Sequence, residues 1–476
     1  MLFNSLDFAI FLPIVFALYW FGTKGSLMRQ NRLLLVASYF FYSCWDYRFL
    51  FLLMFSTLLD YFTGLKMVDD PQRKKFWFWL SISVNIGFLG IFKYYNFFIQ
   101  SFAAALHPLS ISMDVWTLNV ILPVGISFYT FHGLSYVIDI YKERIQPERN
   151  FVDYAVFVTF FPLLVAGPIE RATHLLPQIQ RERHFDYQKG IDGLRQILWG
   201  LFKKIVIADN CAMHANTIFN NASDYSGSTL ALGAVLFAFQ IYGDFSGYSD
   251  IAIGTARLFG IELLRNFAYP YFSRDIAEFW RRWHISLSSW FRDYLYIPLG
   301  GSKTGTWMKI RNTFIIFLVS GFWHGANWTF IVWGGLNALY FLPLLLMKKN
   351  RTHLGTVAEG KYLPSVKEAF QMVLTFFLTT FAWIFFRAAD MTAAINYISH
   401  LFSPSFFHIP EIFPKTILLL LGFFTFIEWM GREQPYAIAK LGLSMPSLVR
   451  WGAYYALMGA IFYFAGAEQA FIYFQF

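Results

Sequence analysis

Charged residues and cysteines are scarce in this sequence of 476 residues. Asp, Glu, Lys and Arg make up 14% of the chain, against roughly 25% in an ordinary soluble domain. Because 57% of the residues are hydrophobic, the chain has too little polar surface to cover its apolar side chains in water. The only two cysteines, Cys44 and Cys211, lie far apart in or beside apolar runs. Their placement excludes a disulfide framework and a cysteine zinc site, and we expect no metal.

The sequence motifs of several soluble enzyme classes are also missing. The chain contains no GxSxG nucleophile elbow, no phosphate-binding P-loop and no dinucleotide fingerprint in a strand-to-helix setting. The usual soluble routes to acyl and phosphoryl transfer are therefore unsupported. The formal charge of +9 does not indicate a nucleic-acid partner, because the basic residues stand in short clusters between apolar runs, as the positive-inside rule predicts.

Long apolar runs are what the sequence has in abundance. Clear examples are residues 8–22, 49–64, 76–92, 369–386 and 451–467. They approach the roughly 20 residues that a helix needs to cross a bilayer, and similar runs predict about ten to thirteen membrane segments. Lipid offers no partner to free backbone groups, and the runs lack the alternation of barrel strands. We therefore predict an all-α polytopic membrane protein with one membrane domain over residues 1–476.

Two stretches depart from simple membrane spans. Residues 270–300 interleave arginines and acidic residues with tryptophans, which predicts an interfacial or re-entrant helix sheltered by its neighbours. Residues 312–347 exceed one span and contain four glycines, which predicts a broken helix or two closely coupled segments. The first apolar run lacks a basic leading region and a cleavage pattern, so we expect a retained helix rather than a signal peptide.

Histidines in apolar surroundings are the main candidates for chemistry. His324 lies in SGFWHGANW at 320–328, and an ionisable residue at membrane depth is costly and usually functional. Its imidazole, with an ordinary pKa of about 6.5, can accept and return a proton near neutral pH. The alternative is that His324 only hydrogen-bonds a neighbouring helix. His284 can share a cavity with His324 or anchor an interfacial helix. His132 merits a functional hypothesis by the same membrane-depth argument, but the sequence indicates no partner for it, so it is interpreted as a packed polar residue.

Two carboxylates stand in DFSGYSD at residues 244–250, directly after an apolar run. Asp244 and Asp250 can orient the histidines or line an entry vestibule. The favoured interpretation is that they cap a helix, because a carboxylate accepts readily from the free N–H groups of a first helical turn. In the charged stretch, Glu278 can pair with Arg281 or Arg282 at helical spacing.

The motifs taken together resemble those of the membrane-bound O-acyltransferase family. They are DFSGYSD at 244–250, FWRRWHISL at 279–287, WFRDYLYIPLGG at 290–301 and GFWHG at 321–325. LFNS at 2–5 and AGPI at 166–169 extend the likeness over most of the chain. These last motifs look like the bacterial branch that acetylates extracellular polysaccharides such as alginate.

The resemblance implies a fold, a donor and a route. The expected fold is a ring of helices around a thinned centre with a central tunnel, and its histidine-containing core covers approximately residues 230–347. The expected donor is cytoplasmic acetyl-CoA, with no permanently bound cofactor. Acetyl would cross the bacterial inner membrane to a periplasmic acetyltransferase partner, which passes it to the polysaccharide acceptor.

The resemblance also implies roles for individual residues. His324 is expected to be the catalytic histidine, and His284 the second, supporting one. Arg281 and Arg282 are expected to hold the anionic parts of coenzyme A. The complete set of predicted substrate-binding residues, all drawn from these motifs, is Arg281, Arg282, Asp244, Tyr248, Trp323 and Asn327.

Two alternatives stay open at this point. The same fold can carry D-alanine or a longer acyl chain to a cell-envelope polymer. A non-enzymatic transporter or export-complex scaffold would use buried histidines for proton relay or packing. The sequence does not name the polymer.

Overall fold

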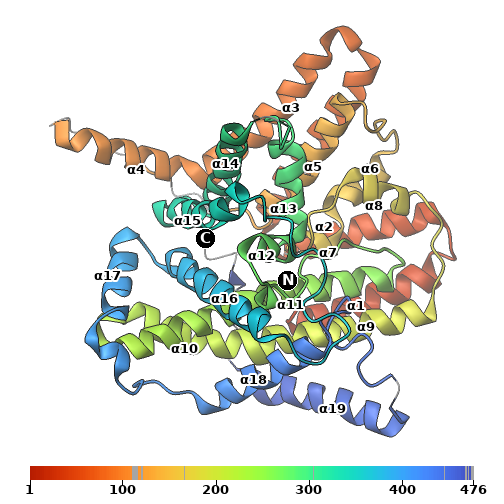
Figure 1. Cartoon of the computed structure of the whole chain (residues 1–476). Helices are drawn as coiled ribbons and strands as arrows, with labels where there is room; N and C mark the ends of the chain where they lie inside the picture. Colours follow the sequence, from red (N-terminus) through yellow and green to blue (C-terminus); the bar gives the residue numbers. More distant parts are fainter. Residues whose placement is uncertain are drawn as a thin grey trace. The chain divides into compact units, whose positions relative to one another are not determined.

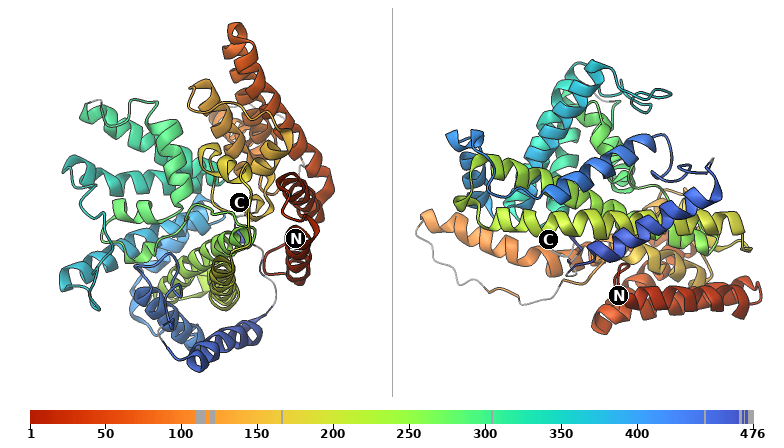
Figure 2. Two further views of the ribbon diagram at one scale, coloured as in Figure 1. Left: turned by 90° about the vertical axis from the view of Figure 1, so that its right-hand side faces the viewer. Right: turned by 90° about the horizontal axis from the view of Figure 1, so that it is seen from below.

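The computed structural model describes residues 1–109, 116–118, 122–165, 167–303, 305–443, 445–466, 469 and 471–472. Every regular element in this described part of the chain is a helix, which confirms the predicted all-α class. The predicted single domain contains two compact units: Met1–Gly190 with Thr255–Leu264, and Ile191–Gly254 with Arg265–Phe476. Figures 1 and 2 show the helices of both units.

The first unit contains the helices of the N-terminal part of the chain. Its α-helices are α1 (Leu6–Ala17), α2 (Leu27–Asp69), α3 (Lys74–Leu89), α4 (Tyr95–Leu106), α5 (Ile126–Tyr141), α6 (Phe151–Thr159), α7 (Phe161–Leu164) and α8 (Ala172–Ile179). Shorter π- and 3-10 elements extend or join them at Leu18–Gly22, Pro71–Arg73, Gly90–Tyr94 and His107–Leu109. Helix α9 (Tyr187–Leu201) begins in this unit and continues in the second.

The second unit contains most of the remaining helices. They are α10 (Asp209–Asn220), α11 (Gly227–Leu258), α12 (Ile276–Arg282), α13 (Ile285–Phe291), α14 (Thr306–His324), α15 (Trp328–Leu346), α16 (Val366–Arg387), α17 (Met391–Leu401), α18 (Lys415–Met430) and α19 (Ser447–Phe464). The shorter elements are η5 (Phe202–Ala208), η6 (Ala222–Asp224), η7 (Pro270–Phe272), η8 (Arg292–Tyr296) and η9 (Pro404–Phe407).

Five helical stretches of the described residues are long and apolar enough to cross a membrane: Leu27–Asp69, Pro71–Leu109, Gly227–Leu258, Trp328–Leu346 and Val366–Arg387. At 1.5 Å per residue, the 43 residues of α2 extend about 65 Å, roughly twice the hydrocarbon thickness of a bilayer. Its backbone leaves the helical region at Asp46, whose carboxylate accepts from the Arg48 backbone and guanidinium.

The five stretches are fewer than the roughly ten to thirteen segments predicted from apolar runs alone. Several of those runs form shorter helices. Helix α5, for example, has 16 residues and buries thirteen of them inside the protein. An apolar run in this protein can therefore reflect packing against other helices, and its sequence does not distinguish this cause from contact with lipid.

Glycines and buried ion pairs hold α9 and η5 against α11 in the second unit. A Cβ added to Gly200 would lie 2.7 Å from the Gly247 carbonyl oxygen, so the two backbones approach more closely than side chains allow. Beside this contact, Lys203 Nζ lies 2.5 Å from Asp250 and Lys204 Nζ lies 2.8 Å from Asp244. Both aspartates stand inside α11, so the helix-cap interpretation of Asp244 and Asp250 was wrong.

Helices α14 and α15 form the broken pair that the glycine-rich run predicts. They are separated by residues 325–327 and pack side by side (Figure 1). A Cβ on Gly321 would lie 2.2 Å from the Phe330 carbonyl oxygen, and one on Gly334 would lie 2.3 Å from that of Phe317. Helices α12 and α13 have seven residues each, which confirms that the charged stretch is not a lipid-facing span.

Candidate functional site

His284 stands at the junction of two short helices. Helix α12 ends at Arg282, α13 begins at Ile285, and the His284 backbone between them has φ 43°. A positive φ is uncommon for a residue with a side chain and strains the backbone, so the surrounding packing must hold it. The turn buries the ring, leaving His284 1% exposed, with the Phe245 ring edge-on at a centroid distance of 4.6 Å.

His324 is the last residue of α14, and its ring is packed among aromatic side chains. The residue is 4% exposed, and its ring centroid lies 5.2 Å from that of Trp333 and 5.2 Å from that of Phe386. Trp323 contacts both histidines, at centroid distances of 4.8 Å to His324 and 6.2 Å to His284. The close packing of α15 on α14 therefore positions His324, because Trp333 belongs to α15.

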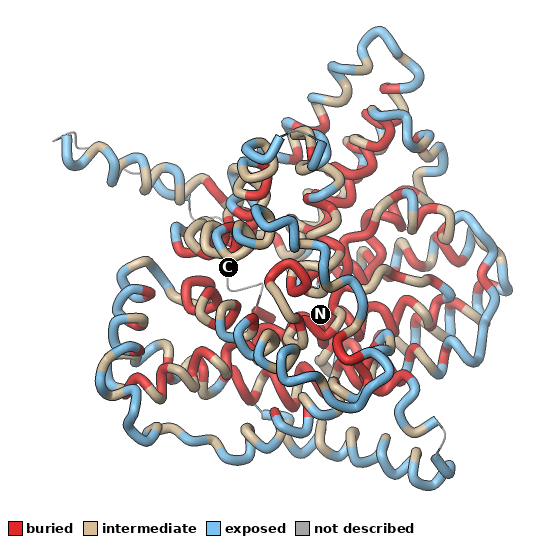
Figure 3. The backbone as a smooth tube through the Cα atoms, viewed as in Figure 1, coloured by how far each residue is buried: buried red, intermediate tan, exposed pale blue. Residues whose placement is uncertain are grey.

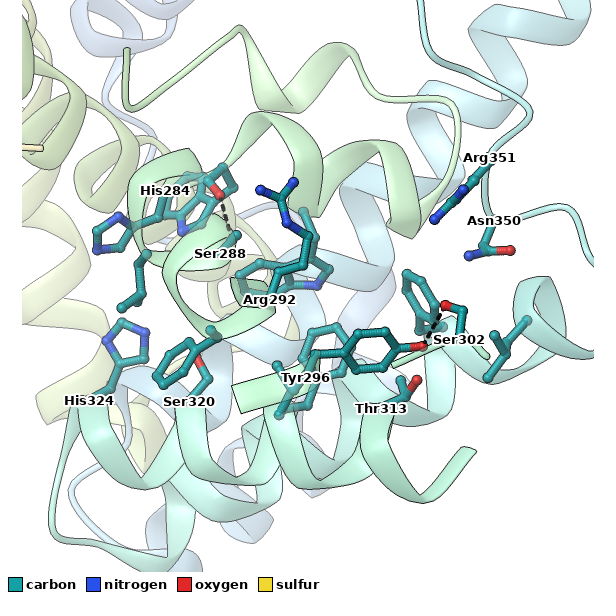
Figure 4. Close-up of a pocket in the computed structure, with 18 residues that line it drawn as sticks. His284, Ser288, Arg292, Tyr296, Ser302, Thr313, Ser320, His324, Asn350 and Arg351 are labelled. Atoms are coloured by element: carbon teal, nitrogen blue, oxygen red, sulfur yellow. Dashed lines mark hydrogen bonds between the residues drawn. The ribbon is translucent and has the colours of Figure 1, made fainter. Parts of the chain in front are cut away.

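Both histidines line one cavity of about 220 Å³ (Figure 4). The two rings lie at one end, whereas Ser302, Asn350 and Arg351 lie toward the other. The lining between these ends is largely aromatic and apolar. Its polar groups are the Arg292 guanidinium and the hydroxyls of Tyr296, Ser288, Thr313 and Ser320. The cavity thus combines two imidazoles at one end with cationic groups farther along.

Asn266 determines which nitrogen of His284 carries the proton. The Asn266 Oδ1 lies 3.0 Å from His284 Nδ1 and also accepts from the Ser286 hydroxyl at 2.9 Å. Because an amide oxygen can only accept, His284 Nδ1 must donate, and in the neutral ring Nε2 then carries the lone pair. Asn266 itself is fully buried and donates from Nδ2 to Ser249 at 3.1 Å.

Burial determines the charge of His284. This residue lies outside the five candidate membrane-spanning helices. Desolvation lowers the pKa of His284 to about 3, so the imidazole is neutral at physiological pH. A neutral ring held by Nδ1–H can accept a proton or a hydrogen bond at Nε2. Asn266 was missed by the sequence analysis, because it is 18 residues from His284 and belongs to none of the motifs.

The structure places Arg281 and Arg282 outside the cavity lining. Arg281 donates to the carbonyl oxygens of Asn350 and His353, at 2.8 and 2.7 Å. Arg282 pairs with Glu278 at 3.0 Å, as its helical spacing predicts, and donates to the Gly355 carbonyl oxygen. These contacts tie the chain after α15 to α12. A role for either arginine in holding the donor stays a prediction.

The other predicted substrate-binding residues also have structural contacts. Asp244 accepts from the Ile472 backbone N–H at 2.7 Å, in addition to its ion pair with Lys204. Tyr248 packs its ring on Phe471, with a centroid distance of 4.5 Å. Asn327 caps α15 through the Thr329 N–H, and its amide donates to the Ala389 carbonyl oxygen. Of the predicted set, only His284 and His324 line the cavity, and Trp323 contacts both of them.

His132 is a packed polar residue, 1% exposed, as predicted, and the structure adds the partner that the sequence did not indicate. In the first unit, His132 Nε2 accepts from the Glu170 backbone N–H at 3.1 Å. The buried Glu170 carboxylate in turn lies 2.7 Å from His174 Nδ1 and accepts from the Leu264 N–H. These groups link α5, α8 and the segment after α11. Among the described residues, no group of three or more histidines, cysteines or carboxylates is placed to hold a metal ion.

Comparison with known proteins gives a consistent result. The model of the membrane-bound O-acyltransferase family matches residues 141–386, which include both cavity histidines. The chain is 40% identical over 407 residues to a probable alginate O-acetylase of Pseudomonas putida, covering 85% of this chain and 80% of the relative. It is 36% identical to a peptidoglycan O-acetyltransferase of Helicobacter pylori, covering 83% of this chain and 79% of the relative.

A third relative is more distant. The chain is 28% identical to a teichoic acid D-alanyltransferase of Bacillus subtilis, and the match covers 56% of this chain and 69% of the relative. The family motifs, the helical fold and the match over residues 141–386 agree. This chain is a multi-pass membrane acyltransferase and belongs to the membrane-bound O-acyltransferase family.

Proposed function

We propose that this protein takes an acetyl group from cytoplasmic acetyl-CoA and passes it across the bacterial inner membrane for O-acetylation of a cell-envelope polysaccharide. The observation that carries the proposal is the pairing of His284 and His324 on one cavity. The acetyl group is favoured over D-alanine because the match to the O-acetylating relatives covers 83% or more of this chain, against 56% for the D-alanyltransferase. A transporter role without chemistry is dropped, since the family consists of acyltransferases.

In the proposed reaction His324 is the general base. Its imidazole takes the proton of an acceptor hydroxyl, whose oxygen forms a bond to the thioester carbonyl carbon. The carbon–sulfur bond then breaks, and the leaving thiolate receives the proton from His324. A positioned base contributes about 10²–10⁴-fold to the rate. An alternative in which His324 carries the acetyl group between donor and acceptor uses the same residue.

His284 is proposed to orient the substrate from the other side. With Nδ1–H donated to Asn266, the neutral ring presents Nε2 as an acceptor for a substrate O–H or N–H. This arrangement does not favour donation of a hydrogen bond to an oxyanion, because that would require a protonated ring and burial lowers the pKa of His284 to about 3. The geometry therefore supports an acceptor role for His284.

The cationic end of the cavity suits an anionic donor. Arg351 lines this end of the cavity and Arg292 lines it nearer the histidines, where Arg292 also pairs with Asp293 at 2.7 Å. Arg281 and Arg282 do not line the cavity and are held by backbone carbonyls and Glu278. A guanidinium binds phosphate oxygens well. We therefore include Arg292 and Arg351 among the groups proposed to receive coenzyme A, with its thioester directed toward the histidines. The final transfer to sugar hydroxyls is assigned to a periplasmic acetyltransferase partner.

The test measures acetyl-CoA-dependent acetylation in membranes that contain wild-type or His324→Ala protein at matched, folded abundance. His400→Ala is the control, because His400 lies on α17 and does not line the cavity. We expect a loss of at least about 10²-fold for His324→Ala and wild-type activity for the control. Equal activity of the three proteins would remove His324 from the chemistry. D-alanine transfer without acetyl transfer by the wild type would overturn the proposed cargo.

A further inference from the structure

Helix α19 (Ser447–Phe464) is the least packed of the apolar helices in the second unit. It buries none of its residues, in contrast to its neighbour α18 (Figure 3). A cavity of about 510 Å³ lies between α19, α18 and the α9–η5 region. This volume is within the range of about 300–1,000 Å³ that is typical of ligand sites. The cavity is separate from the one that contains the histidines.

The walls of this cavity are apolar apart from one end. Its α19 wall consists of Arg450, Ala453, Tyr454, Ala456, Leu457 and Ala460. These positions share one face of the helix, and the three alanines leave room where larger side chains would fill it. From Arg450 to Ala460 the wall extends about 15 Å at 1.5 Å per residue. The opposite wall is formed by large hydrophobic residues such as Trp199, Phe202 and Phe423.

Two arginines gather at the Arg450 end. Arg450 lines the cavity, and the Arg195 guanidinium lies 5.9 Å from the ring centroid of Tyr454, one helical turn beyond Arg450. Arg195 is 8% exposed and donates to the Ile438 carbonyl oxygen, while its Nε has no hydrogen-bond partner among the described residues. No described carboxylate forms an ion pair with either arginine. A buried cation without a counter-ion is costly, so this end favours an anionic ligand.

We propose that this cavity binds an anionic phospholipid. One acyl chain lies along the alanine face of α19, and the phosphate lies at Arg450 and Arg195. The hydrocarbon chain fills an apolar space that water would fill poorly, and the phosphate supplies the missing counter-charge. The lipid would thereby connect α19 to α18 and η5. This proposal does not depend on the acyl group that the enzyme transfers.

The test uses delipidated full-length protein in detergent, titrated with phosphatidylglycerol or with phosphatidylcholine of the same chains and followed by native mass spectrometry. We expect one phosphatidylglycerol per chain, bound more tightly than phosphatidylcholine. Arg450→Gln should weaken phosphatidylglycerol binding about five-fold, which corresponds to roughly 1 kcal/mol per basic residue at a lipid surface. Lys415→Gln, at an exposed lysine that does not line the cavity, is the charge control.

A second pair of variants tests the acyl-chain wall. Ala456→Phe places a ring in the path of the acyl chain and should abolish retention of the lipid. Gly459→Phe on the same helix should not, because a Cβ on Gly459 meets no atom within 4 Å. Equal lipid retention by these two variants would overturn the proposal. So would equal affinity for the two lipids, or Arg450→Gln binding phosphatidylglycerol as the wild type does. The arginine variant keeps the test decisive if Ala456→Phe fails to fold.

Discussion

The close contact between α14 and α15 leads to a sharp prediction about three glycines. A Cβ on Gly321 would lie 2.2 Å from the Phe330 carbonyl oxygen, and one on Gly334 would lie 2.3 Å from the Phe317 carbonyl oxygen. Both obstacles are backbone atoms, which cannot move aside as a flexible side chain can. Gly335 differs, because its nearest neighbour would be the Leu318 Cδ2 atom at 3.9 Å, an ordinary van der Waals contact.

The expected magnitudes follow from these distances. Replacing a helical glycine by alanine gains up to about 1 kcal/mol when there is space for the methyl group. Forcing an extra methyl group into a well-packed contact costs about 1–3 kcal/mol. Gly335→Ala should therefore leave stability unchanged or slightly increased. Gly321→Ala and Gly334→Ala should each lower the free energy of unfolding by roughly 1–3 kcal/mol, because the helices must separate.

Activity should follow the same order. Gly321 is one turn before His324, and the His324 ring packs on Trp333 of α15, next to Gly334. Separation of the two helices would therefore shift the histidine relative to the cavity. A misplacement of about 1 Å can cost on the order of 10²-fold in rate.

The assay is thermal unfolding of the three purified alanine variants in one detergent, with acetyl transfer measured at a temperature where all are folded. The expected order of stability places Gly335→Ala at or above the wild type and the other two below it. The reasoning is refuted if Gly334→Ala unfolds at the same temperature as Gly335→Ala. It is also refuted if Gly321→Ala retains full activity at reduced stability, since His324 would then not depend on the helix contact.

Three further predictions concern buried polar groups. Asn266→Leu should lower acetyl transfer by about 10²-fold. Asn266→Asp still accepts from His284 and should retain activity, but the acid limb of its pH–activity profile should move to higher pH. Identical pH–activity profiles for Asn266→Asp and the wild type would contradict this. The Glu170 carboxylate raises the pKa of His174, so this pair stabilises the fold fully below pH about 6.5 and loses its effect as pH rises through the raised pKa. As pH rises from about 6 to 8, the melting temperature should fall more for the wild type than for His174→Gln. Parallel plots of melting temperature against pH would contradict a stabilising His174–Glu170 pair. Lys204→Met leaves two aspartates without their cation and should cost about 3–5 kcal/mol in denaturant unfolding; a loss below about 1 kcal/mol would show that the carboxylates find other partners.

Local pattern was sufficient for the class of the fold. A charged content of 14% with long apolar runs allows only membrane helices, because lipid leaves no other way to satisfy the backbone. The glycines of residues 312–347 predicted the break between α14 and α15, since close helix contacts require small residues. The apolar surroundings of His324 singled it out, because an ionisable side chain there is costly. The structure places it on one cavity with His284, and its catalytic role stays a prediction.

Contacts between distant parts of the chain decided the rest. Asp244 looked like a helix cap, yet it lies inside α11 and pairs with Lys204, 40 residues earlier in the sequence. Asn266 lies outside every motif but sets the tautomer of His284. Arg281 and Arg282 use their N–H groups on backbone carbonyls, because the chain after α15 folds back onto α12. A residue's type determines what it can bind. Its actual partner depends on which segments of the chain pack against each other, and only the tertiary structure specifies that packing.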